Sequence, residues 1–216
     1  MDKRFAIFDM DGTLVDSMVY WENLAAEFLE SKGVQNISQD ILERIKPMTM
    51  TESAALFIRE YGLSGTAENV AAEMNTMMDE HYRKDIPLKP GVQAYLEALY
   101  RRGVTMCVAS ATAEDLMEAC LTRLGVARCF SFLLSCETVG AGKNRPDVYL
   151  EAAKRLGAQP QDIAVYEDAI YAAETAKNVG FYTVAVQDDT NLPHWETLSA
   201  LADEVILDWQ TAAQTL

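Results

Sequence analysis

The chain has 216 residues, of which 50% are hydrophobic and 24% are charged, which is typical of a globular protein and excludes disordered, collagen-like and small disulfide-rich classes. It carries 18 Lys and Arg against 33 Asp and Glu, and the net charge of −15 disfavours nucleic acid and anionic membrane surfaces as partners. Because no apolar run approaches the ~20 residues of a membrane span and the four cysteines form no C-x-x-C pair, we expect a cytoplasmic protein with reduced thiols.

Short apolar runs, taken in chain order, predict the strands of a buried sheet. We expect strands at residues 5–8, 104–109, 130–134, 163–166 and 181–186, and an edge strand at 205–207. Helical patterns follow at residues 90–102, 113–124, 146–156 and 169–179. This alternation predicts an α/β fold with a doubly wound parallel sheet that is covered by helices on both faces.

Residues 17–85 interrupt the alternation with a helical block. Helices are expected at 17–32, 38–46, 52–61 and 66–84, and no convincing strand lies among them. Thr49 and Glu52 have the spacing of a capping box before the third helix. We therefore predict a Rossmann-like core of residues 1–16 and 86–216 with an inserted all-helical cap of residues 17–85, and a hinge near Pro87 and Pro90.

Polar residues follow the predicted strands at the points where ligands bind in open parallel sheets. Asp9, Asp11 and Thr13 follow the first strand, Ser110 and Thr112 the second, and Glu167 and Asp168 the fourth, while Lys143 lies between the third strand and the next helix. Carboxylates packed together repel one another unless a cation lies between them. A hard divalent cation, Mg²⁺, is the expected cofactor.

The run FDMDGTLVDS from Phe8 to Ser17 contains a pattern that resembles the signature of a known superfamily. D-x-D-G-T after a hydrophobic strand resembles the signature of the haloacid dehalogenase superfamily of phosphotransferases. Ser110, Lys143 and the pair Glu167-Asp168 fit the later motifs of that superfamily, so the match covers essentially the whole chain. The helical block resembles the small cap of the subfamily that holds phosphoglycolate phosphatase and β-phosphoglucomutase.

The resemblance assigns the chemistry to the first motif. It implies that Asp9 attacks phosphorus and forms an aspartyl-phosphate, and that Asp11 protonates the leaving oxygen and then takes a proton from water. Mg²⁺ would be held by Asp9, the backbone carbonyl of Asp11 and Asp168, with Glu167 as a weaker or more distant ligand.

The later motifs are expected to hold the phosphoryl group. Ser110, the backbone N–H of Ala111 and Lys143 would bind its oxygens. The chain departs from the family pattern at Asn144, where many relatives have Pro, and at Ala169, where they have Ser. The lost serine is expected to affect the rate more than the type of reaction.

Two features select among the reactions of the superfamily. Asp11 favours cleavage of a phosphate monoester over dehalogenation. The positions at which β-phosphoglucomutase has a cap histidine and a cap arginine fall here on Trp21 and near Met50, with Lys46 as the only nearby cation. We therefore expect a monomeric phosphatase for a small phosphorylated metabolite. The alternatives are a sugar-phosphate mutase and a non-catalytic phosphate-binding regulatory protein.

Overall fold

A six-stranded parallel sheet forms the centre of the computed structural model, which describes residues 3–216 apart from the side chain of Glu22. The strand order is β3-β2-β1-β4-β5-β6, and every neighbouring pair is parallel. The strands are β1 Phe5–Phe8, β2 Thr105–Ser110, β3 Phe130–Ser135, β4 Ile163–Glu167, β5 Tyr182–Val186 and β6 Glu204–Ile206. The expected doubly wound parallel sheet is confirmed, with ends shifted by about one residue.

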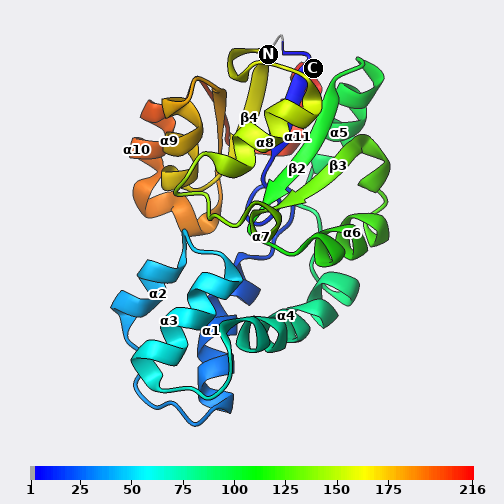
Figure 1. The fold of residues 1–216 in the computed structure, drawn as a ribbon. Coiled ribbons are helices and arrows are strands. Elements are labelled where there is room, and N and C mark those ends of the chain that lie inside the picture. The colour runs from blue at the N-terminus through cyan, green and yellow to red at the C-terminus, as the bar shows by residue number, and fades with distance from the viewer. Residues whose placement is uncertain (1–2) are drawn as a thin grey trace.

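Helices cover both faces of this sheet (Figure 1). Alternate residues of β1 enter different apolar clusters, because Ala6 and Phe8 pack on one face and Ile7 packs on the other. The covering helices are α5 Val92–Arg101, α6 Glu114–Arg123, α7 Cys136–Val139, α8 Asp147–Leu156, α9 Ile170–Asn178, α10 Trp195–Leu201 and α11 Trp209–Thr215. Helices α7, α10 and α11 were not expected from the sequence. They have four to seven residues, too few for an apolar periodicity to stand out.

Residues 17–85 form four helices, α1 Met18–Ser31, α2 Gln39–Ile45, α3 Met50–Tyr61 and α4 Ala67–Lys84. Side chains such as Phe28, Phe57 and Met78 are buried among them. The predicted capping box is present at the start of α3, where Thr49 and Glu52 bond to each other's backbone N–H groups. The helices lie below the sheet in Figure 1, at the end to which β2 and β3 point.

Two chain segments connect the helical block to the sheet, and they run side by side. Asp16 N–H donates to the carbonyl of Pro87 at 3.0 Å, and Lys89 N–H donates to the carbonyl of Leu14 at 2.9 Å. We propose that this pairing is the hinge between a core of residues 1–16 and 86–216 and a cap of residues 17–85.

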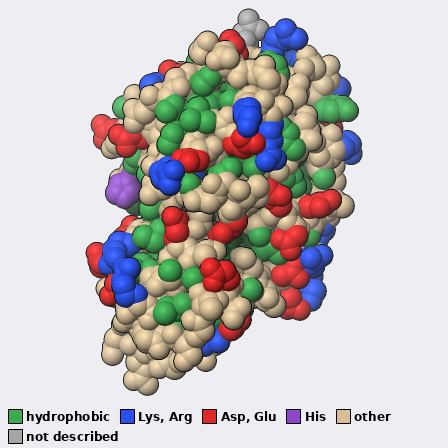
Figure 2. All heavy atoms as spheres, in the orientation of Figure 1, with side chains coloured by type: hydrophobic (Ala, Val, Ile, Leu, Met, Phe, Trp, Pro, Cys, Tyr) green, Lys and Arg blue, Asp and Glu red, His purple; other side chains and the backbone are tan. Residues whose placement is uncertain are grey.

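The surface agrees with the acidic composition. Figure 2 shows Asp and Glu side chains spread over the face in view, with Lys and Arg in small separate groups. All four cysteines are buried and unpaired. Among residues 3–216, no helix combines the length and the apolar character needed to cross a membrane.

Candidate active site

The acidic residues meet where the strand order reverses, at the carboxyl ends of β1 and β4. These strands are adjacent, and the backbone N–H of Asp9 donates to the carbonyl of Tyr166 at 3.0 Å. Asp9, Glu167 and Asp168 each place a carboxylate oxygen within 4.8 Å of the others, and all three residues are buried. Ligands of doubly wound sheets bind at this switch point, so the fold itself positions the cluster.

The turn after β1 brings its backbone against Asp168. Gly12 has φ +75°, and a Cβ there would lie 2.4 Å from Oδ2 of Asp168, so no other residue fits without displacing the carboxylate. The hydroxyl of Thr13 donates to Oδ1 of Asp168 at 2.9 Å. Both residues of the D-x-D-G-T motif therefore position Asp168.

Lys143 is the cation of the cluster. Its Nζ lies 2.6 Å from Oδ1 of Asp9 and 2.7 Å from Oε1 of Glu167, and its side chain is almost fully buried. Burial opposes its charge, but the carboxylates of Asp9 and Glu167 outweigh that effect and raise the pKa of Lys143 well above its usual value. Lys143 therefore stays an ammonium and attracts the carboxylate of Asp9.

Glu167 binds Lys143 through Oε1, whereas its Oε2 has no hydrogen-bond partner among the described residues. Its Oε1 accepts hydrogen bonds from Lys143 and from the hydroxyl of Tyr149 at 2.6 Å. Oε2 is the buried side-chain polar atom without a hydrogen-bond partner among the described residues. Burial raises the pKa of Glu167 to about 7, despite the opposing effect of Lys143. An orphaned buried carboxylate oxygen is costly, so a ligand or a bound water is expected there.

The donor set fits a divalent cation. Three buried carboxylates against one ammonium leave two negative charges in a small volume. Burial and the neighbouring carboxylates raise the pKa of Asp168 well above its usual value, and burial also raises that of Asp9. A hard cation with oxygen ligands would offset this repulsion between the carboxylates, and Mg²⁺ prefers such ligands.

Asp11 lies beside this cluster, and hydroxyl groups hold its carboxylate. Oδ1 accepts from Ser17 at 2.5 Å and from Tyr82 at 2.7 Å. Oδ2 accepts from Thr112 at 2.6 Å and, over a longer 3.4 Å, from Ser110. The two aspartates of the motif thus have different partners, since Asp9 faces Lys143 and Asp11 faces hydroxyls.

Tyr82 was not expected at the site. It lies on α4, 71 residues from Asp11, and is fully buried. Its hydroxyl also accepts from the indole N–H of Trp21 at 2.8 Å. Burial, together with Asp11, raises the pKa of Tyr82 well above its usual value, so it stays a donor. No local motif marks this residue, because only the packing of α4 brings it to Asp11.

Two further residues support the site from the C-terminal part of the chain. The indole N–H of Trp209 donates to the carbonyl of Thr13 at 3.1 Å. The side-chain amide of Asn191 donates to the carbonyls of Asp168 and Val186, both at 2.9 Å, and so ties the loop after β4 to the end of β5. Sequence reasoning missed both, since they follow the last recognised motif.

The remaining expected residues lie in different surroundings. Ser110 is buried at the end of β2, and Ala111 follows it in the loop. Met50 is buried at the start of α3, whereas Lys46 is exposed and pairs with Glu43. The structure therefore brings the core residues together, whereas Lys46, the cap cation expected near the site, is exposed to solvent.

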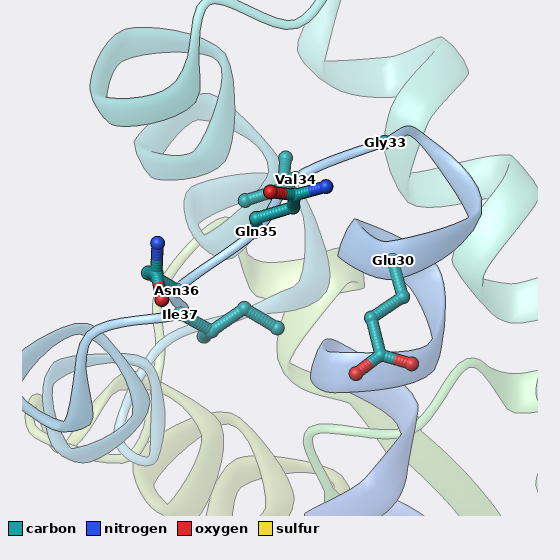
Figure 3. A pocket seen from close by; sticks show the side chains of 6 residues that line it. All are labelled: Glu30, Gly33, Val34, Gln35, Asn36 and Ile37. Carbon is teal, nitrogen blue, oxygen red and sulfur yellow. The ribbon is translucent and has the colours of Figure 1, made fainter.

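Figure 3 shows a hollow on the helical block, which none of the residues of this cluster lines. It has a volume of about 470 Å³ and is lined by Glu30 and residues 33–37. Glu30 follows Ser17 by 13 residues along α1, a helical length of about 20 Å. Its one charged side chain, Glu30, is a carboxylate, so the hollow is unsuited to a phosphate group.

Comparison with known proteins gives matches along most of the chain. The family model of haloacid dehalogenase-like hydrolases matches residues 6–186. A bifunctional riboflavin kinase/FMN phosphatase of Arabidopsis thaliana is 29% identical over 201 residues, which are 93% of this chain and 52% of that protein. The chain thus spans about half the length of that relative.

Two relatives of similar size extend the comparison. Hexitol phosphatase B of Escherichia coli strain K12 is 27% identical over 186 residues, covering 84% of this chain and 82% of that protein. The crystal structure of CbbY from Rhodobacter sphaeroides in complex with phosphate has a TM-score of 0.81 at 21% identity, over 99% of this chain and all of that one. At this identity the structural match concerns the fold alone.

Proposed function

The chain belongs to the haloacid dehalogenase-like hydrolase family, and we propose that it is a Mg²⁺-dependent phosphatase that hydrolyses a small phosphorylated metabolite through an aspartyl-phosphate. Its relatives include proteins described as phosphatases, which supports phosphoric monoester hydrolysis as the reaction class. The observation that carries the proposal is the pairing of buried Asp9 with Lys143 beside Asp168, with Asp11 two residues further on.

The first step transfers the phosphoryl group to the protein. A carboxylate oxygen of Asp9 attacks phosphorus, and the bond from phosphorus to the ester oxygen breaks with its electron pair. Asp11, which must be in its protonated form for this step, gives its proton to that oxygen, so the alcohol leaves neutral. Lys143, Ser110 and the Ala111 N–H neutralise and orient the phosphoryl oxygens.

The second step releases phosphate. A water oxygen attacks the phosphorus of the aspartyl-phosphate, and Asp11, now a carboxylate, accepts the water proton. The bond between phosphorus and Asp9 breaks and restores the carboxylate. Asp9, Asp168 and the carbonyl of Asp11 would hold Mg²⁺, with Glu167 at or near it. Bound there, the ion supplies positive charge that offsets repulsion between the carboxylates and an anionic substrate.

The cap supports hydrolysis over mutase chemistry. A mutase needs a cap group that can bind a second phosphate. Trp21 offers one indole N–H, which Tyr82 already accepts, and the thioether of Met50 offers no donor. The uncharged side chains at these two positions support a substrate whose far end carries no phosphate.

The test is a phosphate-release assay with p-nitrophenyl phosphate and a panel of sugar phosphates, phosphoglycolate and nucleotides. Mass spectrometry after acid quenching should find the phosphoryl group on Asp9. Turnover with Mg²⁺ and labelling of Asp9 would support the phosphatase. Binding of phosphate without turnover of any ester would instead favour the non-catalytic regulatory alternative.

A further inference from the structure

Residues 46–52, which comprise the link between α2 and α3 and the first turn of α3, lie against the core, and we refer to them as the cap segment. The hydroxyl of Tyr171 donates to the carbonyl of Lys46 at 2.7 Å. The carbonyl oxygen of Pro47 lies against Gly142, where a Cβ would come within 2.2 Å of it. A side chain at residue 142 would therefore force the cap segment away from the core.

The third contact is a pair of hydrogen bonds to the carboxylate of Glu137 on α7. Its Oε1 accepts the backbone N–H of Thr51 at 3.1 Å, and its Oε2 accepts the Thr51 hydroxyl at 2.9 Å. Thr51 lies in the first turn of α3, where backbone N–H groups lack helical partners and the helix dipole is positive. The carboxylate of Glu137 in the core thus accepts a backbone N–H group at the N-terminus of α3 that has no acceptor within the helix.

The three contact points lie close along the chain to residues of the candidate active site. Gly142 directly precedes Lys143, and Tyr171 follows Asp168 by three residues. Glu137 lies between the end of β3 and the loop that carries Lys143. In Figure 1, α7 lies at the end of the sheet that faces the helical block. The cap segment is therefore fixed to the loop that carries Lys143 and to α7 and α9, the helices that adjoin the loops of the candidate site.

We propose that Glu137 is a positioning residue that holds the cap segment closed over the phosphoryl site. Substrate entry requires that the two bonds to Thr51 break, and the reaction requires that they form again, because closure excludes water and orients the substrate. The contact itself is independent of the reaction, whereas its effect on turnover rests on the proposed phosphatase function.

Hydrogen exchange of the free protein tests the contact directly. In Glu137→Gln the charge of the acceptor is lost, and hydrogen bonds to charged groups are about twice as strong as neutral ones. The Thr51 amide should then exchange about tenfold faster than in the wild type. Thr51→Val, which removes only the hydroxyl, should give a smaller increase. Unchanged exchange at Thr51 in Glu137→Gln would overturn the proposal.

Asp203 provides a matched control within the core. Its Oδ2 accepts both the backbone N–H of Thr183 at 2.8 Å and the Thr183 hydroxyl at 3.1 Å, the same pair of bonds that Glu137 makes. Asp203→Asn should speed exchange at Thr183 and leave the cap segment unchanged. Faster exchange of the cap segment in both variants would indicate general destabilisation and would count against a specific role of Glu137.

Steady-state kinetics then tests positioning. With a small alkyl phosphate, Glu137→Gln should lower kcat/KM about tenfold, while Asp203→Asn stays within about twofold. Calorimetric Mg²⁺ affinity should be the same in both, because the acidic cluster of Asp9, Glu167 and Asp168 is unchanged. Faster exchange with an unaltered kcat/KM would overturn the positioning role. If the wild type cleaves no ester, the phosphatase proposal fails, and the exchange experiment still decides whether Glu137 holds the cap segment.

Discussion

The ammonium of Lys143 lies 2.6 Å from Oδ1 of Asp9, and both side chains are buried. The contact with Lys143 lowers the pKa of Asp9 and so favours its carboxylate form, whereas burial raises that pKa and has the larger effect. The contact also places a cation where the transferred phosphoryl group would arrive. The charge states of the proposed nucleophile, Asp9, and of the proposed phosphate ligand, Lys143, therefore depend on each other.

Asp9→Asn should abolish turnover and preserve the fold, because an amide is no nucleophile toward phosphorus. We expect a loss of at least ~10³-fold in kcat, measured as phosphate release from p-nitrophenyl phosphate. Asp85→Asn, on the exposed end of α4, is the control and should keep wild-type activity. Near-normal turnover of Asp9→Asn would remove Asp9 from this role.

Chelation should stop the reaction reversibly. Without a cation, Asp9, Glu167 and Asp168 repel the substrate phosphate, so EDTA should abolish activity and excess Mg²⁺ should restore it. Ca²⁺ should substitute poorly, because its larger and looser coordination shell misplaces the nucleophile. Full activity in metal-free buffer would contradict the metal assignment.

Gly12→Ala should weaken Mg²⁺ binding, because its Cβ would lie 2.4 Å from Oδ2 of Asp168. Gly125→Ala is a matched control, since Gly125 has φ +76° and open space at its Cβ. Both changes should cost about 1–2 kcal/mol of folding free energy for the left-handed backbone. Calorimetry should show a lower Mg²⁺ affinity in Gly12→Ala alone, and equal affinities would refute the steric argument.

The sequence predicts the sheet and the residues at its strand ends well, because both follow from local patterns. Buried parallel strands are continuous apolar runs, and Asp9 and Asp168 come directly after two of them. Local patterns do not predict the contacts that Tyr82 and Trp209 make at the site. Their contacts with Asp11 and Thr13 span 71 and 196 residues and arise from the packing of α4 and α11, which no local pattern encodes.

The cysteines should be inert in the folded protein. All four are buried thiols, and burial raises the pKa of Cys120 to about 11 and that of Cys136 to about 12. At pH 8 the native protein should therefore react slowly with Ellman's reagent. The denatured protein should release four equivalents of thionitrobenzoate, one for each thiol, at once. Rapid reaction of the native protein would show that one of these thiols is accessible.

The protein should act as a hydrolase rather than a mutase when both reactions are possible. With β-glucose 1-phosphate and a catalytic amount of the bisphosphate, we expect free phosphate to appear faster than glucose 6-phosphate. A mutase must turn a bisphosphate round beneath its cap, and here Trp21 is bonded to Tyr82 while Lys46 pairs with Glu43 in solvent. Faster formation of glucose 6-phosphate would overturn the assignment. Trp21→His combined with Met50→Arg should not install mutase activity. The change at Trp21 removes its hydrogen bond to Tyr82. Closure of the cap must also be timed to protect the aspartyl-phosphate from water.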